Sequence, residues 1–216
     1  MFCNENNIKI GDFAGLRETV KFYVREKRYA HILGVEEEIS KLADLFGFGG
    51  EILNKLKAAA ILHDITKEFD KKKQLEICEA YNIKVSLDDK RAQKPVHAKT
   101  GAYIAKLEFG ADDLIFSAIC RHTLGVPCSG FAADKLLYLA DFMEPNRIYE
   151  DCVEVREYFY SKIKTATSSI EKFKILDETM LFAYNKSIEG LLKENLFVHK
   201  DTVKYRNSFI KENIMV

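Results

Sequence analysis

The chain has few of the features that mark membrane or exported proteins. Its 216 residues include three prolines, no tryptophan and only five histidines. No stretch approaches the ~18 apolar residues of a membrane-spanning helix, so we expect no membrane partner. The N-terminus lacks a basic start followed by an apolar run, which is the pattern of a signal peptide. These absences predict a cytoplasmic protein.

The chain also lacks a surplus of charge of either sign. Lysine plus arginine number 33 and aspartate plus glutamate number 33, so the formal net charge is zero. General nucleic-acid binders usually carry a basic surplus, and we therefore expect no nucleic-acid partner. An anionic ligand would have to be held by local positive charge. The hydrophobic content of 47% is sufficient for a full core.

Cysteine usage argues against a disulfide framework or a zinc knuckle. The five cysteines are odd in number and form no C-x-x-C pair. Such a pattern favours free thiols, or small buried apolar side chains, in a reducing compartment. The residues concerned are Cys3, Cys78, Cys120, Cys128 and Cys152.

Apolar residues recur at helical spacing along most of the chain, whereas no convincing period-two alternation appears. The fold class is therefore predicted to be all-α. The C-terminal stretch 197–209 is less regular, and it carries the fifth histidine, His199, which we expect on the surface. The helical patterns cover 12–27, 29–46, 51–65, 70–81, 95–109, 111–123, 131–143 and, with a break at 165–169, 150–195.

Four of the five histidines fall in an ordered series with two aspartates, close to the ends of apolar segments. Imidazole and carboxylate bind divalent iron, manganese or zinc, and imidazole ionises near neutral pH. A lone histidine is more often an ordinary core or surface residue, but the series as a whole indicates a metal site between helices. Its members are His31, His63, Asp64, His97, His122 and Asp141.

The adjacent pair His63 and Asp64 constrains how such a site could form. Neighbours on a helix point about 100° apart, so both can reach one metal only at a helix end or with ligands from other helices. We expect His31 and Asp141 to supply those ligands, which leaves open positions on an octahedral iron or manganese. Asp64 would bridge to a second metal, if one is present. Lys67 could place its ammonium beside the site, although by itself it reads as a solvated lysine.

The local sequence around these residues resembles the HD-domain metal-dependent phosphohydrolase superfamily. Within it, the chain looks like the bacterial HD-domain symmetrical bis(5'-nucleosyl)-tetraphosphatases, small all-helical iron enzymes that split diadenosine tetraphosphate into two ADP. The strings that carry this resemblance are RYAHILGV (28–35), ILHDITK (61–67), PVHAKTGA (95–102), CRHTLG (120–125) and YLADFMEPNR (138–147).

The resemblance implies an HD-type helical bundle as a single domain over residues 12–207. Residues 1–11 would then be an N-terminal extension and 208–216 a C-terminal tail. The segment 166–173 reads as extra length between the last helices. The implied cofactor is one or two divalent metal ions, with iron favoured and manganese as the alternative. A homodimer is one candidate assembly.

The resemblance also implies roles for individual residues. His31, His63, Asp64 and Asp141 match the ligands of the tighter metal, and Asp64 and Lys67 are the expected catalytic residues. His97 and His122 match the positions that bind the second metal or contact phosphate. Substrate-binding positions are His97, His122, Thr123, Arg147, Asp201, Thr202 and Tyr205. Arg147 taken alone could be a surface arginine, and Tyr205 could equally pack in the core.

The expected reaction is the attack of metal-bound hydroxide on a phosphoanhydride, which splits diadenosine tetraphosphate symmetrically into two ADP. Dinucleoside polyphosphate or ADP is thus the expected ligand. Other HD-superfamily nucleotide phosphohydrolases, such as deoxynucleotide phosphohydrolases and cyclic-nucleotide phosphodiesterases, are the first alternative. A non-catalytic nucleotide sensor is an alternative of another class, against which the intact series of metal-binding residues argues.

Overall fold

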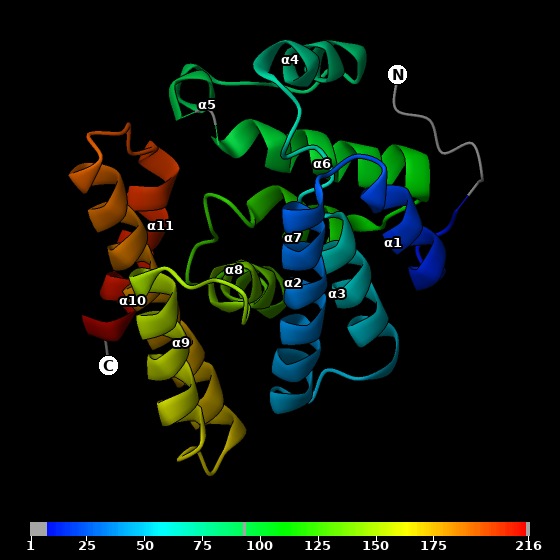
Figure 1. Cartoon of the computed structure of the whole chain (residues 1–216). Helices are drawn as coiled ribbons and strands as arrows, with labels where there is room; N and C mark the ends of the chain where they lie inside the picture. Colours follow the sequence, from blue (N-terminus) through cyan, green and yellow to red (C-terminus); the bar gives the residue numbers. More distant parts are fainter. Residues whose placement is uncertain (1–7, 93, 215–216) are drawn as a thin grey trace.

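The computed structural model describes residues 8–92 and 94–214, which form eleven α-helices and no strand (Figure 1). The predicted all-α fold class is confirmed. The helices are α1 (Phe13–Lys21), α2 (Glu26–Leu45), α3 (Gly50–Leu62), α4 (Lys71–Ala80), α5 (Leu87–Ala92), α6 (Lys94–Phe109), α7 (Asp113–Arg121), α8 (Ala132–Met143), α9 (Glu150–Ile163), α10 (Ser169–Lys193) and α11 (Lys200–Ile214).

Helix α8 lies at the centre of the packing. It contacts α2, α3 and α7 on one side and α9 and α10 on the other, and Figure 1 shows it nearly end-on between these two groups. Most of its apolar residues are buried, and each buried leucine contributes roughly 1.5–3 kcal/mol relative to an exposed one. This arrangement holds the C-terminal end of α8 close to α2. The buried residues include Leu136, Leu137, Leu139, Ala140 and Met143.

Side-chain caps fix where several helices begin. The carboxylates of Asp12, Asp70 and Asp112 each accept a hydrogen bond from a backbone N–H of the following first turn. Ser168 and Glu171 form a reciprocal capping box at the start of α10. These bonds satisfy N–H groups that have no partner within the helix.

Two predicted helices are shorter in the structure than in the sequence pattern. The helix predicted over 12–27 ends at Lys21, and the chain turns before α2 begins at Glu26. The helix predicted over 51–65 ends at Leu62. Tight turns follow it, with hydrogen bonds from Ile65 N to Leu62 O (3.2 Å) and from Lys67 N to Asp64 O (2.9 Å). This early end places the His63–Asp64 pair at a helix terminus, as a shared site requires.

Helical structure is also more extensive than predicted in two places. The short helix α5 was not predicted, since four of the six residues in its sequence LDDKRA are charged. The stretch 197–209 was expected to be irregular, but α11 is a continuous helix that extends through the predicted tail as far as Ile214. Its few apolar contacts, such as the fully buried Phe209, give only a weak periodic signal.

The cysteines and the apolar helices agree with the sequence-based expectations where they can be compared. Cys78, Cys120 and Cys152 carry free thiols, and Cys128 Sγ lies 3.6 Å from Asp177 Oδ2. Cys3 lies outside the described residues. Within 8–92 and 94–214, no helix is long and apolar enough to cross a bilayer.

Candidate metal centre

The six residues of the predicted metal series come from five helices and meet in one place. His31 lies in α2, His97 in the first turn of α6, and Asp141 near the end of α8. His63 is the C-terminal cap of α3, with Asp64 directly after it, and His122 is the C-terminal cap of α7. Five of the six residues therefore lie at or next to the end of a helix. All but Asp141 are buried, and the Asp141 side chain is 18% exposed.

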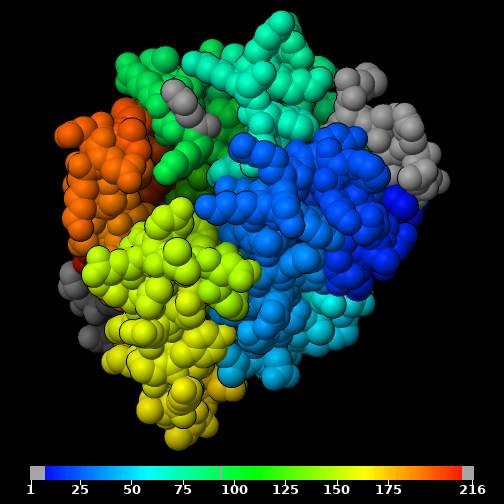
Figure 2. Space-filling view, in the orientation of Figure 1, coloured from blue at the N-terminus to red at the C-terminus, as the bar shows by residue number. Residues whose placement is uncertain are grey.

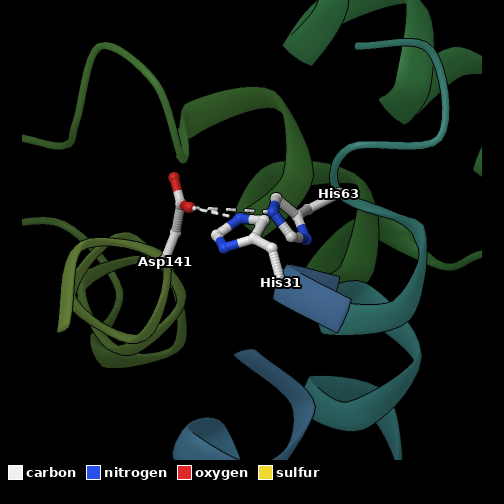
Figure 3. Close-up of side chains that lie close together, drawn as sticks. All are labelled: His31, His63 and Asp141. Atoms are coloured by element: carbon white, nitrogen blue, oxygen red, sulfur yellow. Dashed lines mark ion pairs between the residues drawn. The ribbon is translucent and has the colours of Figure 1, made fainter. Parts of the chain in front are cut away.

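His31, His63 and Asp141 form one half of this cluster (Figure 3). The Oδ1 atom of Asp141 lies 3.0 Å from His31 Nε2 and 3.8 Å from His63 Nε2. Figure 3 shows the two imidazoles reaching toward the carboxylate from α2 and from the end of α3. The three side chains offer ligand atoms within 4.8 Å of one another, a separation that one ion can span.

The two carboxylate oxygens of Asp64 face different histidines. Oδ2 lies 3.7 Å from His31 Nε2 and 3.5 Å from His63 Nε2. Oδ1 lies 3.0 Å from His97 Nε2 and 3.5 Å from His122 Nε2. Asp64 thus stands between the two halves of the cluster, which is the position that a bridging carboxylate requires.

His97 and His122 form the second half. Their Nε2 atoms are 3.0 Å apart, and Thr123 Oγ1 lies 3.2 Å from His122 Nε2. Burial lowers the pKa of His97 to about 3, with a further contribution from the neighbouring Lys67 ammonium. His97 is therefore neutral at physiological pH, which is the form of imidazole that binds metals.

The ionisation of the other members of the cluster differs between residues. Burial alone would lower the pKa of His31, but hydrogen bonds to Asp141 and Glu144 outweigh it and raise that pKa. Burial lowers the pKa of His63. Burial alone would raise the pKa of Asp64 and of Asp141, but interactions with neighbouring side chains outweigh it and hold both well below the ordinary value. These side chains include His63 and Lys67 around Asp64, and Arg147 around Asp141. Both carboxylates are therefore ionised at neutral pH.

The hydrogen bonding of the cluster fits a metal ion. Buried polar atoms are normally hydrogen-bonded, yet His31 Nε2, His63 Nε2 and Asp64 Oδ1 have no such partner in the part of the chain that the structure describes. The two imidazole nitrogens face the carboxylate of Asp141, and Asp64 Oδ1 faces His97 and His122. Because imidazole nitrogens and carboxylate oxygens are ligands of iron, manganese and zinc, this donor set fits a divalent ion.

Hydrogen bonds from the outside orient the histidines. Nδ1 of His63 is 2.7 Å from Ala60 O, and Nδ1 of His122 is 2.6 Å from Ile119 O. The buried carboxylate of Glu144 lies 3.1 Å from His31 Nδ1. A proton on each Nδ1 leaves Nε2 free as a ligand atom, which is the usual arrangement around a metal.

Glu144 was not predicted from the sequence, although it lies in the EPN string that precedes Arg147. Its close approach to α2 depends on Gly34, because a Cβ atom there would collide with the Glu144 carboxylate. Gly34, one turn after His31, and Glu144, three residues after Asp141, therefore contact each other although they lie far apart in the sequence.

Two arginines and a lysine surround the cluster. Arg147 Nη2 lies 2.6 Å from Asp141 Oδ1, so it is not a free surface arginine. Arg28 Nη1 lies 2.8 Å from Asp64 Oδ2, a contact that we did not predict. Lys67 Nζ lies 3.1 Å from His97 Nε2 and 3.9 Å from Asp64 Oδ1, and it projects from the turn after α3 rather than from a helix face.

The predicted substrate-binding residues of α11 form no hydrogen bond with the six metal-series side chains among the described residues. Thr202 Oγ1 donates to Leu124 O at 3.4 Å, in the loop after His122. The hydrogen bonds of Asp201, Thr202 and Tyr205 instead reach neighbouring loops and helices. Their expected contact with the nucleotide stays a prediction.

The expectation of a surface position for His199 was wrong. Its side chain is 3% exposed, because it packs against α5, with Nε2 3.6 Å from Asp89 Oδ1. Its Nδ1 accepts a hydrogen bond from Asp201 N. The unpredicted helix α5 supplies this partner, so the sequence held no sign of it.

The comparisons with known proteins agree with this site. The HD domain model matches residues 28–150, more than half of the chain. The "Bis(5'-nucleosyl)-tetraphosphatase, symmetrical" of Halalkalibacterium halodurans is 31% identical over 198 residues, which cover 90% of this chain and 95% of that protein. The chain belongs to the HD-domain family of symmetrical bis(5'-nucleosyl)-tetraphosphatases.

Two further similarities support this HD-domain assignment. The Bacillus subtilis protein of the same name is 33% identical over 184 residues, covering 85% of this chain and 89% of that one. A solved structure described as a predicted HD superfamily hydrolase involved in NAD metabolism, from Clostridium acetobutylicum, aligns with a TM-score of 0.79 at 25% identity. It covers 93% of this chain and 97% of that structure. The predicted family and the HD-type helical fold are confirmed.

Proposed function

We propose that the protein is a metal-dependent hydrolase that splits diadenosine tetraphosphate symmetrically into two ADP. The observation that carries this proposal is the convergence of two ionised aspartates and four histidines, with Arg147 beside them, in a chain whose relatives bear that activity in their names. In the reaction, a water oxygen bonds to one inner phosphorus as the central P–O bond breaks. The departing ADP takes the electron pair and a proton.

We propose that His31, His63, Asp64 and Asp141 hold a first divalent ion. His97, His122 and the second oxygen of Asp64 would hold a second ion or face a phosphate. The donor set supports a divalent metal, and among these we favour iron, with manganese as the alternative. Such an ion would neutralise negative charge on the phosphates. It would also lower the pKa of a bound water toward neutrality.

The side chains around the ligands are suited to a polyphosphate. Arg147 carries a planar guanidinium with several N–H donors, and its Nε is buried without a hydrogen bond among the described residues. Lys67 adds an ammonium on the other side of the cluster, next to His97. Positive charge on both sides would stabilise the negative charge that develops during transfer of a phosphoryl group.

A substrate panel with metal-loaded protein tests the function. Protein loaded anaerobically with iron should hydrolyse diadenosine tetraphosphate faster than deoxynucleoside triphosphates or cyclic dinucleotides. Parallel samples loaded with manganese or zinc identify the active metal. Faster hydrolysis of either alternative substrate would assign another HD-superfamily activity. Nucleotide binding without hydrolysis under every metal would support a sensor.

We propose a cytoplasmic protein that acts on free dinucleotides, without a nucleic-acid partner, and we retain the homodimer as the candidate assembly. Residues 12–207 stay our proposal for the extent of the domain. Light scattering of the purified chain would measure the assembly directly.

A further inference from the structure

A cavity of about 220 Å³ opens beside the metal centre. Lys67 and His97 form the end of the cavity that adjoins the cluster. The first turn of α4 and the end of α5 form its other walls, through Lys71 and Lys90. Figure 2 shows a hollow on this face, where the teal residues of α4 and the green residues of α5 and α6 meet the blue start of α2.

Described carboxylates neutralise the positive charge of this cavity only in part. Lys67 is the one lining lysine with an ion pair, at 3.9 Å from Asp64 Oδ1. Lys71 and Lys90 are exposed, and neither forms an ion pair within the described residues. Lys99 and Lys135, by contrast, each lie within 2.7 Å of an aspartate oxygen.

The cavity also offers apolar surface beside its charges. Phe69 and Leu75 line it, and Leu75 is 37% exposed. Phe69 is held by an edge contact with Tyr23, with ring centroids 6.2 Å apart. Aromatic and aliphatic walls with a few polar groups are typical of small-molecule sites. The volume lies below the ~300–1,000 Å³ of a complete ligand pocket, so the cavity suits part of a ligand that continues into the metal centre.

We infer that this lysine-lined cavity binds the second nucleoside diphosphate half of the dinucleotide. Lys71 and Lys90 would contact its phosphates, and the wall at Leu75 would contact its nucleoside. The inference rests on the proposed function, since symmetrical cleavage produces two ADP units that need places on both sides of the scissile bond. Arg147 lies next to Asp141 in the first half of the cluster, and Lys67 lies next to His97 in the second half. The two residues therefore mark the two sides of the scissile bond.

Charge-reversal variants test the inference. Lys71→Glu, Lys90→Glu and the double variant are compared with Lys72→Glu, which changes an exposed α4 lysine that does not line the cavity. Steady-state kinetics on diadenosine tetraphosphate should show the KM rising about tenfold for each single reversal, with little change in kcat. The Lys72→Glu control should stay within about twofold of the unmodified protein.

A truncated substrate separates the phosphate contacts from the nucleoside contact. Adenosine 5'-tetraphosphate lacks the second nucleoside but keeps the four phosphates. The lysine variants should raise the KM for both substrates, whereas Leu75→Ala should raise it for diadenosine tetraphosphate alone. If Leu75→Ala affects both substrates equally, the apolar wall does not contact the nucleoside.

Failure of the inference and failure of the proposed function have different signatures. If the unmodified protein hydrolyses diadenosine tetraphosphate and the double variant matches Lys72→Glu, the cavity assignment is overturned. If the unmodified protein does not hydrolyse it under any metal, the proposed function fails. In that case, calorimetric titration with a methylene-bridged analogue still tests the cavity, because weaker binding to the double variant than to Lys72→Glu would support it and equal binding would overturn it.

Discussion

The guanidinium of Arg28 and the carboxylate of Asp64 form an ion pair, with Nη1 2.8 Å from Oδ2. Arg147 makes the same type of contact with Asp141, at 2.6 Å. Each aspartate of the metal series is therefore paired with an arginine that reaches it from a different element. This pairing gives the site positive charge on two sides, which favours a polyphosphate over a neutral ligand.

Removal of the central carboxylate should remove both metal binding and turnover. We expect Asp64→Ala to lose bound metal and to lower kcat by at least about 100-fold, because both halves of the cluster face this side chain. Elemental analysis and steady-state kinetics measure the two effects. Asp113→Ala is the control, since Asp113 is exposed and pairs with Lys106 at the surface. Full metal content and activity in Asp64→Ala would contradict the assignment.

The second half of the cluster should be separable from the first. His97→Ala and His122→Ala should retain the metal held by His31, His63 and Asp141 while kcat falls about 100-fold. Metal content per chain, measured by elemental analysis after dialysis, distinguishes one retained ion from none. A variant without any metal would show that the two halves form one indivisible site.

Arg147 should act through the shape of its side chain as well as through its charge. Arg147→Lys should weaken the substrate by about tenfold in KM, because a single ammonium cannot replace two parallel N–H donors. Thermal unfolding should change little, since charge is retained. Arg25→Lys, at the exposed ion pair with Glu68, is the matched control. If Arg147→Lys has the same kinetics as Arg25→Lys, Arg147 does not contact the substrate and its role is structural.

The position of the broken bond can be read from the products. Diadenosine tetraphosphate should give only ADP at early times, because charge at Arg147 and at Lys67 lies on both sides of the cluster. Hydrolysis in ¹⁸O-labelled water should place one label on the terminal phosphate of one ADP. Chromatography that shows ATP and AMP would establish asymmetrical cleavage, while leaving a metal-dependent hydrolase in place.

A buried ion cluster away from the metal should contribute to stability in a pH-dependent way. Burial would raise the pKa of Asp89, but hydrogen bonds from Lys99 and Ser86 outweigh it and hold the pKa below its ordinary value of 3.8. His199 faces the same carboxylate. A depressed pKa in the folded state stabilises the protein above the unfolded value, and this stability is lost as the pH falls through the folded value.

Asp89→Asn should therefore lower the free energy of unfolding by about 1–3 kcal/mol at pH 7, with a smaller difference from the unmodified protein below about pH 4. Urea denaturation at both pH values measures this. Asp88→Asn, which alters the neighbouring ion pair with Lys200, serves as the control. A difference that grows on acidification would contradict the sign of the effect.

The sequence by itself determined the helical class, the family and the order of the metal-binding residues. Helical periodicity is a local property, so α2, α6, α8 and α10 could be predicted from their own residues. The ends of helices were less predictable. His63 and Asp64 enter the site together because α3 stops at Leu62, and this stop depends on tight turns that no strong sequence signal marks.

Only the tertiary structure decided which groups meet. The pairing of Arg28 with Asp64, the contact of Glu144 with His31 and the burial of His199 against Asp89 join segments 36, 113 and 110 residues apart in the sequence. The cavity between Lys71 and Lys90 likewise depends on where α4 and α5 pack against α6. Local patterns specify which faces are apolar, whereas packing of those faces fixes the distances between polar side chains on different helices.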